Sequence, residues 1–97
     1  MTYVLIASWT AAAGNGDRIE EILRDLVGPS TAEPGCRQYR PHRAVDDRSA
    51  FVIYEEYDDK AAFAAHCASD HFRTLVLGEA IPLLATRSRS VYAPLVS

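Results

Sequence analysis

Residues suited to acid–base chemistry gather between positions 54 and 71. Tyr54 and Glu56 lie two apart in an aromatic and β-branched stretch, and His66 and His71 follow in an alanine-rich stretch. Residues two apart on a strand share a face, so we expect Tyr54 and Glu56 to present a phenol and a carboxylate to one cavity. A neutral imidazole accepts protons near neutral pH. The pattern predicts a site that orients and deprotonates a phenolic or enolic substrate.

His66 is the residue that we expect to transfer the proton. Its helical neighbours Ala62, Phe63 and Cys67 are small or apolar and would leave the imidazole beside an apolar cavity. His71 stands next to a predicted helix break and is expected to orient the substrate or to cap the helix. A structural alternative stays open for these residues, because a polar side chain can also cap a helix, bridge two subunits or fix a strand to a helix.

A metal site is the other common use of paired histidines, and the spacing argues against it. Ligands on one helix favour i, i+4, whereas a spacing of five places two side chains about 140° apart. His42 is the third histidine and forms no recognisable triad with the nearby carboxylates. Cys36 and Cys67 fit no CxxC spacing, so we expect buried thiols and neither a redox motif nor a zinc knuckle. The sequence predicts no metal site.

Three aromatic residues are expected to complete the substrate-binding set with Tyr54 and Glu56. They are Trp9, Tyr39 and Phe72, each of which could instead be a core residue. Arginines on the second and last predicted strands are expected to face solvent or a subunit contact, although those on the second could supply a cation for an enolate. These arginines are Arg37, Arg40, Arg43, Arg87 and Arg89.

The elements that must position these residues follow from their periodicity. Residues 2–10 are largely apolar at both the odd-numbered and the even-numbered positions, which predicts a strand buried on both faces. Asp17 begins a helix with capping-box spacing, and apolar residues recur at helical intervals as far as Val27. Gly28-Pro29 is expected to weaken or end this helix, with one irregular turn continuing towards Ala32.

The second half of the chain repeats the alternation of strand and helix. A strand at about Cys36 to Ala44 contains Pro41, which indicates an edge position or a bulge. A strand at 51–57 and a helix from Asp58 or Asp59 to about Ala68 come next. After a break at Ser69-Asp70, a second helical piece is expected, which Pro82 disturbs, and the last strand spans 87–95. This β-α-β-β-α-β order with a split second helix is the ferredoxin-like pattern of an α+β fold.

Size and charge limit the partners. A chain of 97 residues fits one domain spanning 1–97, and a hydrophobic content of 48% in so short a chain fits burial against a second copy. The net charge of −3 disfavours nucleic acid and an anionic membrane. The sequence has neither an apolar run long enough to span a bilayer nor a basic flank with a cleavage site, so we expect a cytoplasmic protein.

Two motifs carry a family resemblance. The turn EPGC at 33–36 and the segments YEEY at 54–57 and AFAAHCASDHF at 62–72 resemble the antibiotic biosynthesis monooxygenase family, whose ferredoxin-like protomers form a dimeric α/β barrel. The resemblance implies a homodimer and a cofactor-independent monooxygenase that uses dioxygen and a phenolic, quinol or polyketide-like aromatic substrate. His66 and His71 match histidines of quinol-oxygenase-like and isomerase-like relatives, which implies that both belong to the site.

Two other functions stay open. The first is an isomerase of a small oxidised or phosphorylated metabolite, which arginines clustered in the pocket would favour. The second is a non-enzymatic small-ligand or stress-response barrel, which a pocket filled by side chains would favour. Haem-degrading relatives have a tryptophan at the position of His66 and an axial histidine at that of Val76, so haem is not implied. With no phosphate-cradling glycine loop, we expect no flavin or other cofactor.

Overall fold

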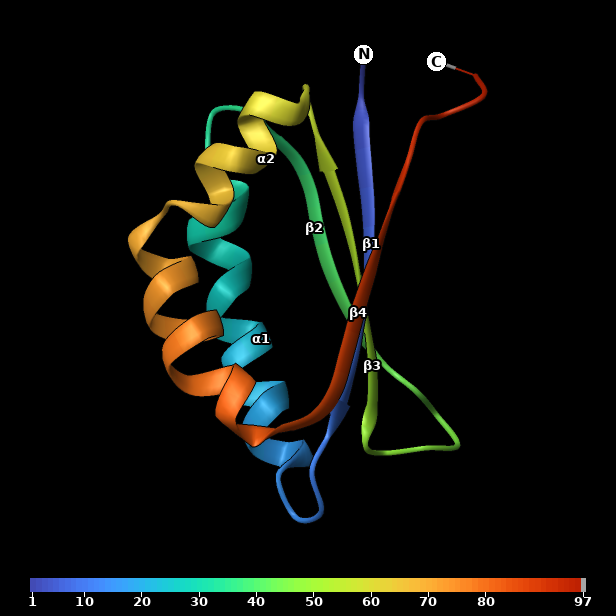
Figure 1. Cartoon of the computed structure of the whole chain (residues 1–97), viewed down its shortest axis with the longest axis vertical. Coiled ribbons are helices and arrows are strands. Elements are labelled where there is room, and N and C mark those ends of the chain that lie inside the picture. The colour runs from blue at the N-terminus through green and yellow to red at the C-terminus, as the bar shows by residue number, and fades with distance from the viewer. Residues whose placement is uncertain (97) are drawn as a thin grey trace.

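A single layer of helices covers one face of an antiparallel four-stranded sheet in the computed structural model, which describes residues 1–96 (Figure 1). The elements are β1 (Tyr3–Ala11), α1 (Gly16–Thr31), β2 (Cys36–Arg43), β3 (Ala50–Tyr57), α2 (Lys60–Cys67), the π-helix η1 (Phe72–Ala80), the short 3₁₀-helix η2 (Ile81–Leu83) and β4 (Leu84–Tyr92). The predicted α+β, ferredoxin-like order with a split second helix is confirmed. The sheet is open and does not close on itself.

The strand order β2-β3-β1-β4 places β1 and β3 at the centre of the sheet and β2 and β4 at its edges. Pro41 lies on edge strand β2, opposite Ile53, so the edge position expected from this proline is confirmed. The helices cover only one face of the central strand β1. Leu5 and Trp9 are buried beneath them. On the other face Val4 is buried, Ile6 and Thr10 are half-buried and Ser8 is exposed, so the expected burial of both faces is complete only under the helices.

Alternation along the two central strands builds the core. Residues on the helix-covered face pack against the apolar side of α1, and the largest fully buried apolar side chains are Leu5, Ile19, Ile22, Leu26, Ile53 and Tyr57. Each Leu or Ile buried in this way contributes about 1.5–3 kcal/mol of transfer free energy. The site described below is built on this rigid layer.

One predicted helix end agrees with the structure and one predicted strand start differs. Helix α1 continues through Pro29 to Thr31, which is the expected last turn towards Ala32, and the Thr31 hydroxyl donates a hydrogen bond to the Val27 carbonyl at 2.7 Å. Strand β4 begins at Leu84, which pairs with Ala11 across a register shift in β1. Among residues 1–96, no helix combines the length and the apolar character needed to cross a membrane.

Candidate functional site

The turn between α1 and β2 brings a carboxylate under helix α2. The Cys36 amide donates a hydrogen bond to the Glu33 carbonyl at 3.1 Å, and the Asp58 amide donates one to the Gly35 carbonyl at 2.8 Å, which ties the turn to the end of β3. A Cβ atom on Gly35 would lie 2.4 Å from the Cβ of Ala62. Only glycine therefore lets α2 pack this closely on the turn that carries Glu33.

Helix α2 positions His66 in an aromatic enclosure. Asp59 caps the helix by accepting a hydrogen bond from the Ala62 amide at 2.8 Å. The His66 side chain is 1% exposed. Four aromatic rings lie with their centroids 5.3–6.3 Å from its ring, and they belong to Tyr39, Tyr57, Phe63 and Phe72. Burial lowers the pKa of His66, and the contact with Glu33 opposes that decrease.

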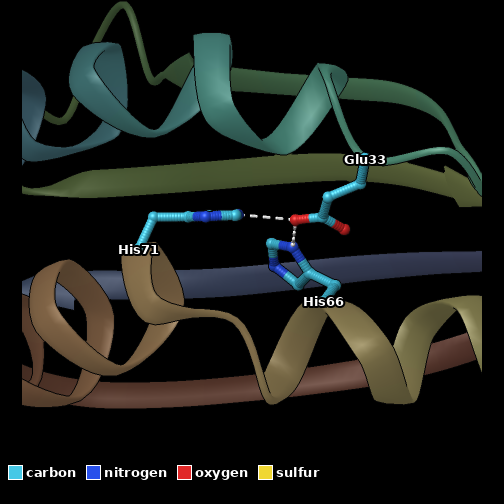
Figure 2. A group of neighbouring side chains, drawn as sticks. All are labelled: Glu33, His66 and His71. Atoms are coloured by element: carbon cyan, nitrogen blue, oxygen red, sulfur yellow. Dashed lines mark hydrogen bonds and ion pairs between the residues drawn. The ribbon is translucent and has the colours of Figure 1, made fainter.

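Glu33 joins the two histidines, as Figure 2 shows. Its Oε2 atom lies 2.7 Å from Nδ1 of His66 and 2.6 Å from Nε2 of His71. The predicted break between the helices makes this possible. The Ser69 hydroxyl donates a hydrogen bond to the His66 carbonyl at 2.6 Å and accepts one from the Phe72 amide at 3.2 Å, so the chain turns and the two imidazoles converge.

These contacts assign the protons of His66. A carboxylate oxygen only accepts hydrogen bonds, so an ionised Glu33 receives the Nδ1–H of His66 and the Nε2–H of His71. The lone pair of His66 is then on Nε2, the nitrogen that lies 3.8 Å from Oε1 of Glu55. A base held in one tautomer by a carboxylate is the arrangement that hydrolytic triads use.

The same three side chains could in principle bind a divalent metal, since their ligand atoms lie within 4.8 Å of one another. The sequence argument missed this convergence because it considered only the spacing along one helix. Ligand atoms that share a tetrahedral metal at about 2.0–2.1 Å are about 3.3 Å apart. The nitrogen-to-oxygen distances of 2.6 and 2.7 Å are those of hydrogen bonds. We therefore interpret the group as a hydrogen-bonded cluster, and the absence of a metal stays a prediction.

A cavity of about 440 Å³ adjoins His66, between the sheet and the segment from α2 to η1. Its apolar wall includes Leu5, Trp9, Phe63, Phe72 and Val76, and its polar lining includes Glu55, His66, Arg87 and Arg89. Tyr39 also lines it. The structure thus brings Trp9, Tyr39, His66 and Phe72 to one cavity, and their roles in binding and catalysis stay predictions. His71 is not among the lining residues and contacts the Glu33 carboxylate.

Glu55 is the carboxyl group of this cavity, and sequence reasoning missed it. The residue is 5% exposed, and its Oε1 atom accepts a hydrogen bond from the Tyr57 hydroxyl at 2.6 Å. Burial raises the pKa of Glu55 to about 7, against the opposing effects of the Tyr57 hydrogen bond and the positive charge of Arg89. A carboxyl group with such a pKa can donate or accept a proton near neutral pH. Its alternation with apolar Phe51 and Ile53 in the sequence was the available signal.

Tyr54 and Glu56 do not line this cavity, which corrects the expectation for them. They share one face of β3, and the Tyr54 hydroxyl donates a hydrogen bond to Oε1 of Glu56 at 2.7 Å. That face is the one without helices. Side chains alternate along a strand, so Glu55, and not its neighbours, points into the cavity.

Two arginines of β4 both face solvent and reach the cavity. Arg87 and Arg89 are exposed, as expected, and both also line the cavity. Arg89 also lies over the Phe63 ring, with its guanidinium carbon 5.2 Å from the ring centroid. Cys67 lines the cavity as a free, partly buried thiol, and burial raises its pKa.

Comparison with solved structures gives close matches over almost the whole chain. Protein PA3566 from Pseudomonas aeruginosa is 36% identical, with a TM-score of 0.90 over 97% of this chain and 94% of that one. An antibiotic biosynthesis monooxygenase is 30% identical, with a TM-score of 0.86 over 98% of this chain and 99% of the other. Rv0793 from Mycobacterium tuberculosis, at 24% identity, a TM-score of 0.91 and coverage of 100% and 98%, supports the fold alone.

A search of curated proteins found no match. The family model described as antibiotic biosynthesis monooxygenase matches residues 2–76, which hold the Glu33 turn, both site histidines and Glu55. The resemblance predicted from the two sequence motifs is thereby confirmed. The chain belongs to the antibiotic biosynthesis monooxygenase family.

Proposed function

We propose that the protein is a cofactor-independent monooxygenase of a phenolic, quinol or polyketide-like aromatic substrate. The observation that carries the proposal is the orientation of His66. Glu33 Oε2 lies 2.7 Å from His66 Nδ1, which leaves Nε2 as the unprotonated nitrogen, and His66 lines a cavity with aromatic and apolar walls. Monooxygenase chemistry is the general role that the family supports. A base beside a pocket with apolar walls supports oxygenation of an electron-rich carbanion without a metal or flavin.

For a substrate that is an aromatic ketone, the proposed reaction converts a methylene carbon acidified by that ketone into a carbonyl. His66 Nε2 removes a proton from that carbon, and the resulting carbanion forms a C–O bond with dioxygen. The peroxide takes up the proton from His66 and becomes a hydroperoxide. Removal of the second C–H proton then breaks the O–O bond, leaving the new carbonyl and releasing one water. The substrate loses four electrons, and dioxygen gains them.

Glu55 supplies a second proton-transfer group on the same cavity. Its pKa of about 7 means that it is partly protonated at neutral pH, and its Oε1 lies 3.8 Å from His66 Nε2. In its acid form it can protonate the peroxide or the departing hydroxide while His66 acts as base. Tyr57 holds this carboxyl group in place from the core.

Isomerisation of a small anionic metabolite is the second candidate. Proton movement from one carbon to another needs one group to remove the proton and one to return it, and His66 and Glu55 meet that need. The arginines that line the cavity also favour this candidate. A purely structural barrel with a pocket filled by side chains is less well supported, because about 440 Å³ of the cavity is open.

Isotope labelling separates the two candidates. Protein dialysed against a chelator is incubated with a panel of naphthohydroquinones and anthrones under ¹⁸O₂. Oxygenation predicts one ¹⁸O atom in the product, one in water and full retention of activity after chelation. Isomerisation predicts product formation without dioxygen and entry of solvent deuterium at carbon. Activity that tracks with bound iron, copper or flavin would overturn the proposal of a cofactor-free enzyme.

We also propose that the protein is a homodimer joined through the face of the sheet that lacks helices. That face carries apolar side chains in its central and edge strands, including Val52, which is 43% exposed, and Tyr92, which is 51% exposed. A small chain gains stability by covering such a surface. Light scattering over a dilution series should give the mass of two chains, and Val52→Lys should shift it to one. A folded monomer at micromolar concentration would contradict this proposal.

A further inference from the structure

Arg87 and Arg89 project into the cavity from edge strand β4. In the sheet register Arg87 lies opposite Trp9 and Arg89 opposite Ala7, both on the helix-covered face. Residues two apart on a strand are separated by about 6.6 Å along it and share a face, so both arginine side chains start from the same face of β4, and both line the cavity. The helix layer leaves β4 uncovered, and both arginines remain accessible to a ligand.

These two arginines differ from most others among residues 1–96 in forming no ion pair with a carboxylate. Six of the nine arginines form ion pairs, namely Arg18, Arg24, Arg37, Arg43, Arg48 and Arg73. Within residues 1–96, Arg40, Arg87 and Arg89 form none. Arg40 lies on the outer face of β2, in register with Tyr54. The unpaired arginines of the helix-covered face are therefore the two that line the cavity.

The cavity supplies only a partial negative charge to balance them. Among residues 1–96, Glu55 is the one acidic residue that lines it, and this group is partly protonated near pH 7. The Glu33 carboxylate is engaged by two histidines behind the cavity wall. Arg89 is restrained over the Phe63 ring, which reduces the ordering that ligand binding requires. A planar, oriented guanidinium fork matches a carboxylate or phosphate through paired hydrogen bonds.

We propose that Arg87 and Arg89 form an anion subsite, and that the substrate is an aromatic molecule bearing a carboxylate or phosphate group. The ring lies against the wall that contains Trp9 and Phe72, the acidic group faces the two arginines, and the reacting carbon faces His66. This assignment deepens the proposed function and rests on the same cavity. The subsite would orient the substrate, because its acidic end is held at β4 and its reacting end then faces the base His66.

Calorimetric titration with matched probes tests the subsite without requiring turnover. The probes are 2-naphthoate, its neutral counterpart 2-naphthamide, and 2-naphthyl phosphate. Charge-assisted hydrogen bonds predict that 2-naphthoate binds at least about tenfold more tightly than 2-naphthamide. The double variant Arg87→Gln/Arg89→Gln should lose that preference and still bind 2-naphthamide. Arg48→Gln, which removes the same kind of charge in the hairpin between β2 and β3, should keep it.

The outcomes are distinct. Equal affinity for 2-naphthoate and 2-naphthamide, a preference that survives the double variant, or no binding of any probe would overturn the subsite. Tighter binding of 2-naphthyl phosphate than of 2-naphthoate would assign the anion as phosphate, and the reverse order as carboxylate. An arginine-dependent preference in a protein that consumes no dioxygen with any bound aromatic would keep the subsite and reject oxygenation. Size-exclusion profiles of all variants should match that of the unaltered protein.

Discussion

The two faces of strand β3 carry the same pair of residue types and differ in their surroundings. On the outer face, the Tyr54 hydroxyl donates to Glu56, and on the helix-covered face the Tyr57 hydroxyl donates to Glu55. Both pairs are two residues apart and have hydrogen bonds of 2.7 and 2.6 Å. Burial raises the pKa of Glu55 to about 7 and places it beside His66. The chemistry therefore comes from the cover that the helices provide, and not from the local motif.

The largest effect is expected from the helix-covered face, at His66. His66→Ala removes the base from the cavity and should lower turnover by about 10² to 10⁴, as loss of a general base does. Steady-state kinetics on a substrate found by the labelling screen measures this loss. A melting curve accompanies it, since turnover that falls only in proportion to unfolded protein would assign His66 a structural role.

Glu33→Gln should have the next largest effect on turnover. The amide keeps the shape of the side chain but no longer stabilises the imidazolium of His66, so we expect about a tenfold loss of kcat. Glu33 raises the pKa of His66, and its loss should therefore move the acidic limb of the kcat/KM profile to lower pH. An unchanged pH profile in Glu33→Gln would rule out a positioning role for Glu33.

His71→Ala keeps the Glu33 contact with His66, so it should raise KM or reduce stability more than it slows the chemistry.

A pH-dependent difference in stability should distinguish Glu55 from Glu56. The pKa of Glu55 rises from an ordinary 4.5 to about 7 on folding, so the folded state binds the proton more tightly. Its stabilising effect is complete below about pH 4.5 and is lost as the pH rises through 7. Relative to Glu55→Gln, the unaltered protein should lose on the order of 2 kcal/mol of unfolding free energy between pH 5 and pH 8.

Urea unfolding at the two pH values measures that difference. Glu56→Gln is the matched control because it leaves Glu55 in place, and its stability should follow the unaltered protein across this pH range. Parallel curves for the unaltered protein and Glu55→Gln would show that burial does not perturb this carboxyl group.

The smallest effects on catalysis are expected on the outer face. Tyr54→Phe and Glu56→Gln each remove one partner of a partly buried hydrogen bond outside the cavity. We expect kcat/KM to stay within about twofold of the unaltered value, because neither side chain lines the cavity. Kinetics at subunit concentrations well above the dimer dissociation constant makes this comparison. A tenfold loss would place these residues back at the site that the sequence pattern suggested for them.

Much of the fold could be predicted from periodicity, because hydrophobic spacing and the residues that cap or break helices are signals within a short stretch of sequence. The capped α2, the break at Ser69 and the edge strand with Pro41 were predicted from residues within a few positions of each other. The sequence did not predict which residues of β3 point towards the helices. An alternating strand has two possible orientations, and YEEY offers a tyrosine and a glutamate to either face.

The partners of the histidines were also beyond the sequence. Glu33 precedes His66 by 33 positions, and the contact depends on packing of α2 against Gly35. The EPGC turn was noticed as a family marker, but nothing local to it indicates that its carboxylate meets two imidazoles. Arg87 and Arg89 are exposed, as predicted, but strand alternation alone does not reveal that they also line the cavity.

Strand β4 also bears on how such a protein changes over evolutionary time. After Leu84 all of its residues are exposed, so substitutions there alter few core contacts and cost little stability. His66 and Glu55, by contrast, are fixed by buried neighbours that tolerate little change. Mutations can thus replace the arginines of β4 and change which ligands bind, while the proton-transfer groups stay constant. The edge strand gives the fold a variable position for selection on substrate preference.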